Sequence, residues 1–122
     1  MIFFCYSKCS TCRNAKKWLD NNNVAYEERD IKTNNPTYEE LKGIYEKSDL
    51  PIKRLFNTSG NVYKELGLKD KLADMPDDEC LKLLATDGML VKRPLVYGDK
   101  VLVGFKEEEW SKMLLDGYNH GS

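Results

Sequence analysis

The chain has 122 residues, of which 41% are hydrophobic and 32% are charged, and its formal net charge is −1. Those values indicate one globular domain with one ordinary hydrophobic core. The balanced charge argues against direct binding of nucleic acid, which needs a basic face or tail. The apolar start, Met1–Tyr6, is shorter than a signal peptide and far shorter than the roughly 20 apolar residues of a membrane span. We therefore expect a cytoplasmic, monomeric protein that has no membrane partner.

The four cysteines carry most of the chemical information in this composition. In a reducing cytosol, cysteines serve metal binding, redox chemistry or packing more often than stable disulfides. A zinc site takes about four cysteine or histidine ligands. However, Cys5, Cys9, Cys12 and Cys80 lack a second closely spaced pair, and the only histidine is His120. We expect no bound metal, and redox chemistry becomes the leading interpretation.

A strand, a helix and a second strand are predicted at the start of the chain. Ile2–Tyr6 is a short apolar run that is typical of a buried strand. Ser10 and Thr11 can cap a helix, which Asn21–Asn23 ends, and residues 24–31 form the next strand. Short connections between these elements predict a parallel strand pair with a right-handed crossover. The apolar positions of the helix recur at helical spacing and are Cys12, Ala15, Trp18 and Leu19.

A helical middle, about 36–87, is predicted next. Its clearest signal is Thr37–Glu40, which follows Pro36 and matches a capping box. The stretch after Pro76 places three acidic residues in a first turn, where they favour a helix, and we expect Gly88 to close it. Further short helical segments are predicted at Pro51–Phe56 and Tyr63–Leu68.

A hairpin and a closing helix complete the expected elements. Two apolar runs, Leu95–Tyr97 and Val101–Val103, flank a two-residue Gly98-Asp99 turn, which is a hairpin signal. A last helix starts at Glu107. Its expected buried side consists of Trp110, Met113 and Leu114.

The Cys9-Ser10-Thr11-Cys12 segment lies where a predicted strand ends and a helix begins. A thiol attacks only as a thiolate, and a free cysteine with a pKa near 8.5 is mostly protonated at neutral pH. The unpaired N–H groups and the dipole of a helix N-terminus stabilise a thiolate, which makes Cys9 the nucleophile. Cys12, one turn further, can attack a mixed disulfide on Cys9 and is the resolving thiol. Such a pair in a βαβ context is typical of thioredoxin-like redox proteins, and two cysteines that only fill space are the alternative.

The other two cysteines fit a simpler role. Cys5 and Cys80 lie among apolar residues of a predicted strand and a predicted helix, which favours ordinary packing.

Arg93-Pro94 comes just before the predicted hairpin. Cis peptide bonds are largely confined to X–Pro, and in thioredoxin-like folds a cis proline precedes the third strand and lies against the active cysteines. Pro94 is the natural candidate, and Arg93 would reach the cysteine loop, where a guanidinium can hold a thiolate or an oxyanion. A surface arginine before an ordinary turn proline is the alternative. We predict catalytic roles for Cys9, Cys12 and Arg93, and substrate contacts for Ser10, Thr11 and Pro94.

Four segments match a known pattern: Tyr6–Ala15, Asn57–Gly60, Tyr63–Leu68 and Leu90–Val96. They resemble the ArsC/Spx family, in order from about residue 2 to 115. Asp87–Leu90 and Gly104–Glu107 resemble an uncharacterised bacterial, arsenate-reductase-related branch of it.

The resemblance implies an α/β, thioredoxin-like fold with a helical insertion between the second and third strands. That insertion corresponds to the helical middle, about 36–87. One domain is expected over 1–116 and a flexible tail over 117–122.

The arsenate reductases of this family resemble the chain at the nucleophile, which falls on Cys9. They lack the second cysteine at Cys12 and rely on glutathione and glutaredoxin. They hold the oxyanion with three arginines, one of which falls on Arg93, whereas Asn57 and Gly104 stand at the other two positions. A charged hydrogen bond contributes about 1.5–3 kcal/mol, so two missing cations argue against efficient arsenate reduction.

The Spx-type transcription regulators provide the other resemblance. They use paired cysteines as a redox switch and have an arginine that resembles Arg93. They contact the RNA polymerase α subunit through a surface that includes a glycine, at whose position this chain has Pro51. The residues that carry that contact are therefore not retained.

The sequence thus predicts a thiol-disulfide oxidoreductase that acts on a disulfide or an oxidised small substrate. A thiol reductant of the glutathione, glutaredoxin or thioredoxin type is the expected electron donor, and no bound cofactor is expected. The alternative is an Spx-like redox-sensing regulator that binds RNA polymerase. A structural domain with a vestigial cysteine pair is the third interpretation.

Overall fold

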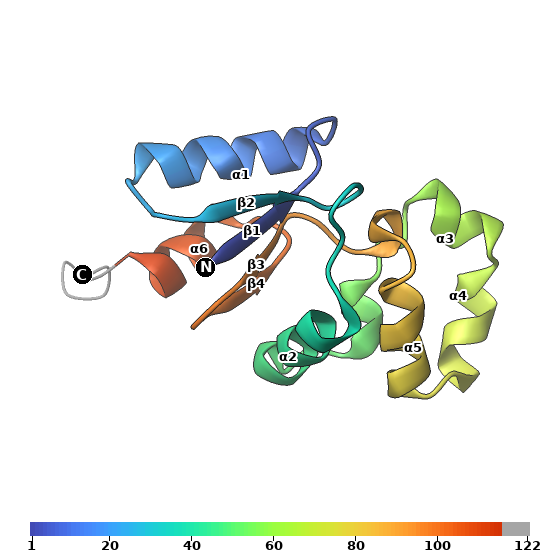
Figure 1. The fold of residues 1–122 in the computed structure, drawn as a ribbon. Helices are drawn as coiled ribbons and strands as arrows, with labels where there is room; N and C mark the ends of the chain where they lie inside the picture. Colours follow the sequence, from blue (N-terminus) through green and yellow to red (C-terminus); the bar gives the residue numbers. More distant parts are fainter. Residues whose placement is uncertain (116–122) are drawn as a thin grey trace.

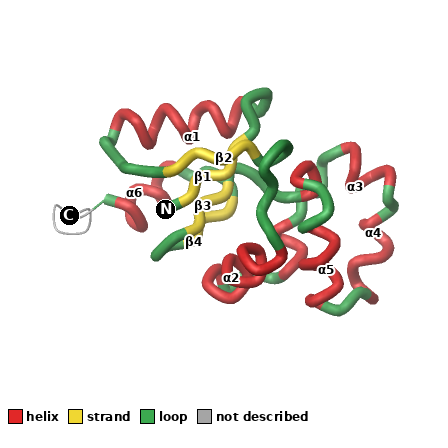
Figure 2. The backbone as a smooth tube through the Cα atoms, viewed as in Figure 1, coloured by secondary structure: helices red, strands yellow, loops and turns green. Residues whose placement is uncertain are grey.

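The computed structural model describes residues 1–115, so the predicted tail at 117–122 lies outside the described residues. A four-stranded sheet in the order β2-β1-β3-β4 runs through the molecule, as Figure 2 shows. Its first two strands pair in parallel and the other neighbours pair antiparallel, which confirms the predicted βαβ opening and closing hairpin. The strands are β1 (Ile2–Cys5), β2 (Glu27–Asp30), β3 (Leu95–Tyr97) and β4 (Val101–Val103).

Helices cover both faces of this sheet (Figure 1). α1 (Ser10–Asn21) and α6 (Glu107–Leu114) pack on one face, and the insertion between β2 and β3 packs on the other through α2 (Tyr38–Ser48). The position of the insertion confirms the expected thioredoxin-like architecture. The rest of the insertion consists of short α-helices and of 3-10 helices, which are labelled η: η1 (Ile52–Leu55), α3 (Asn61–Glu65), α4 (Leu68–Lys71), η2 (Leu72–Asp74), α5 (Asp77–Leu84) and η3 (Gly88–Leu90).

The central strand β1 divides the core into two layers. Successive side chains of a strand point to opposite faces of a sheet. Phe3 and Cys5 therefore join the apolar cluster under α1 and α6, whereas Phe4 joins the larger cluster of the insertion. Burial of Cys5 on the α1 side places its sulfur beneath the helix that carries Cys12.

Arg29 on β2 ties the insertion to the sheet. Its guanidinium pairs with the Glu40 carboxylate, and its Nη2 donates to the Asn35 carbonyl over 3.1 Å. Glu40 also closes the predicted capping box, because its Oε1 accepts from the Thr37 N–H over 2.9 Å while the Thr37 hydroxyl accepts from the Glu40 N–H over 3.1 Å. One carboxylate thus starts α2 and anchors it to β2.

Two predicted elements are shorter in the structure. The strand expected over 24–31 is limited to Glu27–Asp30 because its only partner, β1, offers four residues to the ladder. The helix expected to run to Gly88 ends at Leu84, and Gly88 instead starts the separate turn η3.

Two details at the closing end were predicted wrongly. The hairpin loop spans residues 98–100 rather than the two residues Gly98-Asp99. Met113 of α6 is 39% exposed, since Trp110 alone is buried along this two-turn helix and fills the contact with the sheet.

No helix in the described part of the chain is long and apolar enough to cross a membrane.

Gly88 provides a test of how the insertion closes against β2. A Cβ at this position would come within 1.5 Å of the Ile31 carbonyl oxygen, so the backbone would have to move. We expect Gly88→Ala to lower the free energy of unfolding by at least about 3 kcal/mol, as measured by urea denaturation.

The matched control is Gly67→Ala. Gly67 has a φ of +64° but open surroundings, so this change should cost only about 1–2 kcal/mol. Equal losses in the two variants would contradict the close approach at Gly88.

Candidate active site

Cys9 is the N-cap residue of α1. Its backbone is extended, with φ −96° and ψ 118°. A tight turn precedes the helix, in which the Cys9 N–H donates to the Tyr6 carbonyl over 2.9 Å, and the Cys9 carbonyl accepts the helical bond from Arg13 over 3.1 Å. The prediction that Ser10 or Thr11 caps the helix was therefore wrong, because the turn brings the helix start forward to Cys9. Cys9, the predicted nucleophile, thus stands at the helix N-terminus itself.

The environment of Cys9 favours its thiolate. Burial alone would raise the pKa of this thiol, but the backbone N–H of Cys12, the Cys12 thiol, the backbone N–H of Thr11 and the charge of Arg93 lower it, and the net shift is downward. The Cys9 side chain accepts no cap hydrogen bond of ordinary geometry. The N–H groups thus act mainly as dipoles aimed at the sulfur, as expected at a helix N-terminus.

Cys12 has the opposite character. It is 1% exposed, and burial raises its pKa to about 12, against an opposing contribution from the Tyr6 backbone. The Cys9 sulfur adds to the increase, both as acceptor of the Cys12 S–H and as a neighbouring negative charge. Cys12 therefore stays protonated at neutral pH, whereas the pKa of the neighbouring Cys9 is lowered.

Arg93 is held rigidly beside this pair. Its Nη1 donates to the Val91 carbonyl over 3.2 Å, and its guanidinium lies 5.4 Å from the centre of the Tyr6 ring. With the Asn57 amide oxygen turned toward it, Asn57 accepts from Arg93 Nη2 over 3.2 Å and from Nη1 over 3.3 Å. The Arg93-Pro94 peptide bond is cis, as predicted, and directly precedes β3.

A pocket of about 530 Å³, the Cys9 pocket, joins the nucleophile to the insertion. Thr11 lines it, whereas Ser10 and Pro94 do not: Ser10 is exposed on α1 and Pro94 is buried. The full lining is Cys9, Thr11, Asn57, Ser59, Gly60, Asn61, Val62, Met89, Lys92 and Arg93.

The role of Asn57 was missed in the sequence, where it counted only as a lost cation. Its backbone N–H donates to the Leu90 carbonyl over 2.7 Å, and an isolated bridge pairs Phe56 with Val91. These contacts bring the middle of the insertion against its C-terminal end. Pairing across such a sequence distance leaves no local signal that could have revealed it.

Cys80 is fully buried in the apolar cluster of the insertion, as its predicted packing role requires, and its sulfur donates only a long bond of 3.8 Å to the Met75 carbonyl. Cys5 is also buried, at 6% exposure, but its sulfur meets a charged side chain, since Cys5 Sγ donates to Glu28 Oε2 over 3.3 Å. Packing alone does not describe Cys5. Within residues 1–115, no group of three or more His, Cys, Asp or Glu side chains is arranged to hold a metal ion.

Comparison with known proteins agrees with this fold. The family model described as "ArsC family" matches residues 4–113. The chain belongs to the ArsC family. This membership confirms the resemblance seen in the sequence and places the fold among the ArsC-like thioredoxin folds.

Individual members of the family differ in what they are described to do. The uncharacterized protein YusI of Bacillus subtilis is 53% identical over 113 residues, which cover 92% of this chain and 96% of YusI. A solved structure from Streptococcus mutans, described as "a possible arsenate reductase", is 46% identical with a TM-score of 0.83 over 90% of this chain and 96% of that one. Global transcriptional regulator Spx 2 of Bacillus anthracis is 28% identical over 93% of this chain and 86% of its own length.

The first prediction for the site concerns the pKa of Cys9. Alkylation of Cys9 by iodoacetamide, followed by peptide mass spectrometry, should rise with pH through a midpoint below the value of about 8.5 of a free thiol. Arg93→Gln removes a nearby positive charge and should move that midpoint upward. Lys8→Gln is the control, and as an exposed and screened charge it should move the midpoint less. Equal shifts would contradict the special position of Arg93.

A second prediction tests the contact between Asn57 and Arg93. Asn57→Asp would place a carboxylate against the guanidinium, cancel its positive potential at Cys9 and slow alkylation at neutral pH several-fold. Asn57→Ala keeps the charge of Arg93 and should change the rate less. If the Asp and Ala variants behave alike, Arg93 does not act on Cys9 through its charge.

Proposed function

We propose that this protein is a thiol-disulfide oxidoreductase in which Cys9 is the nucleophile and Cys12 the resolving thiol. The observation that carries the proposal is the placement of Cys9 at the N-terminus of α1, with a lowered pKa, next to a buried and protonated Cys12. A disulfide or an oxidised small thiol in the Cys9 pocket is the substrate class that this pair fits.

The two thiols support an ordered reaction. The Cys9 thiolate attacks a substrate sulfur, the substrate disulfide breaks, and one half leaves as a thiol after taking up a proton. Once Cys9 is part of a mixed disulfide, its negative charge is gone, and with it one cause of the raised pKa of Cys12. Cys12 can then lose its proton and attack Cys9. The second substrate thiol leaves, and a Cys9–Cys12 disulfide remains.

The cations of the Cys9 pocket favour this chemistry over reduction of a doubly charged oxyanion. The guanidinium of Arg93 is already engaged by the Val91 carbonyl, Asn57 and the Tyr6 ring. The Lys92 side chain extends over Gly104, where a Cβ would lie 3.6 Å from Lys92 Cε. The positive charge of Arg93 near Cys9 is therefore suited to stabilising a single leaving thiolate.

A thiol reductant must close the cycle. Two electrons and two protons from a donor of the glutathione, glutaredoxin or thioredoxin type convert the Cys9–Cys12 disulfide back to thiols. The donor becomes a disulfide in the same exchange. The proposed reaction needs no bound cofactor.

An Spx-like regulator is the second candidate, and the similarity to Spx 2 supports it. In that case, oxidation of the same pair would change binding to the RNA polymerase α subunit. Pro51, which precedes η1, stands where the sequence comparison expects a glycine of the contact surface. A pulldown with purified α subunit, on reduced and oxidised protein, would show redox-dependent capture if the regulator function holds.

Turnover of a small model disulfide with a thiol donor tests the enzyme proposal. Cys9→Ser should abolish it, whereas Cys12→Ser should perform one exchange and accumulate a mixed disulfide on Cys9, seen as an added mass in the intact protein. Cys80→Ser is the control and should turn over like the natural protein. Cys9-independent turnover, or full multiple turnover by Cys12→Ser, would contradict the assigned roles.

A further inference from the structure

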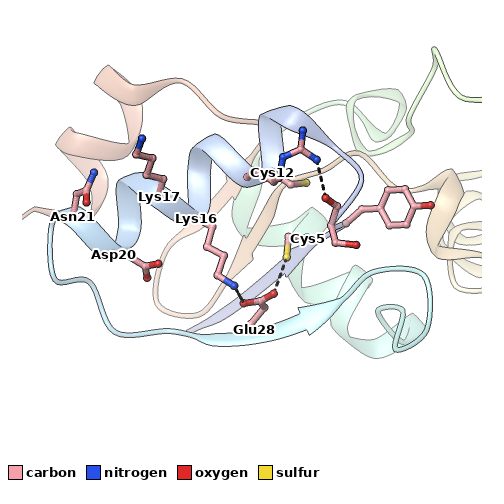
Figure 3. A pocket seen from close by; sticks show the side chains of 10 residues that line it. Cys5, Cys12, Lys16, Lys17, Asp20, Asn21 and Glu28 are labelled. Atoms are coloured by element: carbon pink, nitrogen blue, oxygen red, sulfur yellow. Dashed lines mark hydrogen bonds and ion pairs between the residues drawn. The ribbon is translucent and has the colours of Figure 1, made fainter.

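A third thiol lies under the cysteine pair and is not used by the reaction above. Cys5 ends β1, and its side chain points toward α1, as Figure 3 shows. Its Sγ donates to Glu28 Oε2 over 3.3 Å, and Glu28 Oε1 is 2.8 Å from Lys16 Nζ. A buried thiol that donates its hydrogen bond to a carboxylate has a proton acceptor in place.

Two separate cavities lie beside the cysteine pair, and Cys12 lines one of them. The Cys9 pocket includes Cys9 but not Cys12. A second cavity of about 460 Å³, which we name the Cys5 cavity, includes both Cys5 and Cys12 but not Cys9. Its lining is Cys5, Tyr6, Ser7, Cys12, Arg13, Lys16, Lys17, Asp20, Asn21 and Glu28.

The sulfurs of Cys5 and Cys12 face the same space. Both residues belong to one apolar cluster between α1 and the sheet and both line the Cys5 cavity, and Figure 3 shows the Cys5 sulfur beside Glu28 in the space beneath α1. The resolving thiol is therefore placed to meet either of two other cysteines, one on each side.

We infer that Cys5 is a third redox thiol, which replaces Cys9 as the disulfide partner of Cys12. The disulfide then lies in the Cys5 cavity. This inference rests on the proposed formation of a Cys9–Cys12 disulfide. In the step, the proton of Cys5 passes to the Glu28 carboxylate and the Cys5 sulfur attacks Sγ of Cys12. The Cys9–Cys12 bond breaks, a Cys5–Cys12 bond forms, and Cys9 leaves as a thiolate. The exchange is internal and needs no added oxidant or reductant.

The thiol pKa values give this exchange a direction. In thiol-disulfide exchange, the sulfur of lower pKa is the better leaving group. At equilibrium, the sulfur of lower pKa therefore tends to be the free thiolate, and the sulfur of higher pKa tends to be part of the disulfide. Burial, followed by the hydrogen bond and the charge of Glu28, raises the pKa of Cys5 to about 12, whereas the pKa of Cys9 is lowered. At neutral pH the bonded sulfur should therefore be Cys5 and the free one Cys9. The same burial slows the attack. Glu28 holds the proton on Cys5 in the resting thiol, but it is also the group that can accept this proton as the new bond forms.

Transfer of the disulfide would separate the two halves of the cycle. Cys9 becomes a free thiolate again in the Cys9 pocket while the oxidising equivalent stays at Cys5–Cys12. A thiol reductant would then act in the Cys5 cavity, whose rim carries Lys16, Lys17 and Asp20. The substrate and the electron donor would not compete for one opening.

Trypsin offers a direct test on the full-length protein. Cleavage after Lys8 and Arg13 puts Cys5 in peptide 1–8 and both Cys9 and Cys12 in peptide 9–13. A Cys9–Cys12 disulfide stays as a loop within 9–13, whereas a Cys5–Cys12 disulfide links the two peptides. The reduced protein is oxidised with diamide, quenched at intervals with N-ethylmaleimide in mildly acidic denaturant, and digested without reduction.

The expected result is a looped peptide 9–13 that appears first and gives way to linked peptides 1–8 and 9–13 with Cys9 alkylated. Glu28→Gln should slow this second phase by roughly tenfold or more, as for loss of a general base. Cys80→Ser, which changes a buried thiol of the insertion, should leave both phases unchanged.

Two results would overturn the inference. If the loop forms but Cys5 is alkylated at every time point, Cys5 takes no part, and the proposed oxidoreductase chemistry stands without it. If neither the looped peptide nor the linked peptides form, and no Cys9-dependent turnover is found, the proposed function fails together with the proposed disulfide transfer to Cys5.

Discussion

The proposed chemistry depends on one electrostatic constraint, namely that the Cys9 sulfur stands where the peptide dipoles of α1 begin. Two backbone N–H groups, an S–H and a guanidinium act on the sulfur and outweigh the cost of its partial burial. The same helix places Cys12 one turn deeper, where burial keeps the second thiol protonated. A single helix start thus produces two thiols of opposite character, which is the asymmetry that an ordered exchange needs.

Arg93 extends this constraint to the rest of the chain. The guanidinium is useful only if it stays near Cys9, and three contacts from three segments hold it there: the Tyr6 ring, the Val91 carbonyl and the Asn57 amide. A charge fixed in this way is worth more than one on a free side chain, because no side-chain entropy is lost when the thiolate forms. Asn57 thus supplies no positive charge of its own, and its amide instead holds the Arg93 guanidinium in place.

The local parts of the structure were predictable from sequence, and the long-range parts were not. The strand-helix-strand opening follows from apolar periodicity, the Thr37 capping box from adjacent residues, and the cis bond at Pro94 from the restriction of such bonds to X–Pro. The support of Arg93 by Asn57 depends instead on an isolated bridge between distant segments. The hydrogen bond from Cys5 to Glu28 was not predicted for a similar reason. The parallel register that aligns β1 with β2 decides which side chains meet across the sheet.

The insertion contributes directly to the site, because its middle and its C-terminal end meet to form one wall of the Cys9 pocket. Pairing of Phe56 with Val91, and the bond from the Asn57 N–H to the Leu90 carbonyl, close the insertion directly against the segment that carries Arg93. Arg29 and Glu40 fix its opposite end to β2. If this closure opened, Arg93 would lose its support and Cys9 would lose a charge that lowers its pKa. The reactivity of the nucleophile is thus coupled to the docking of a segment that contributes no sulfur to the reaction.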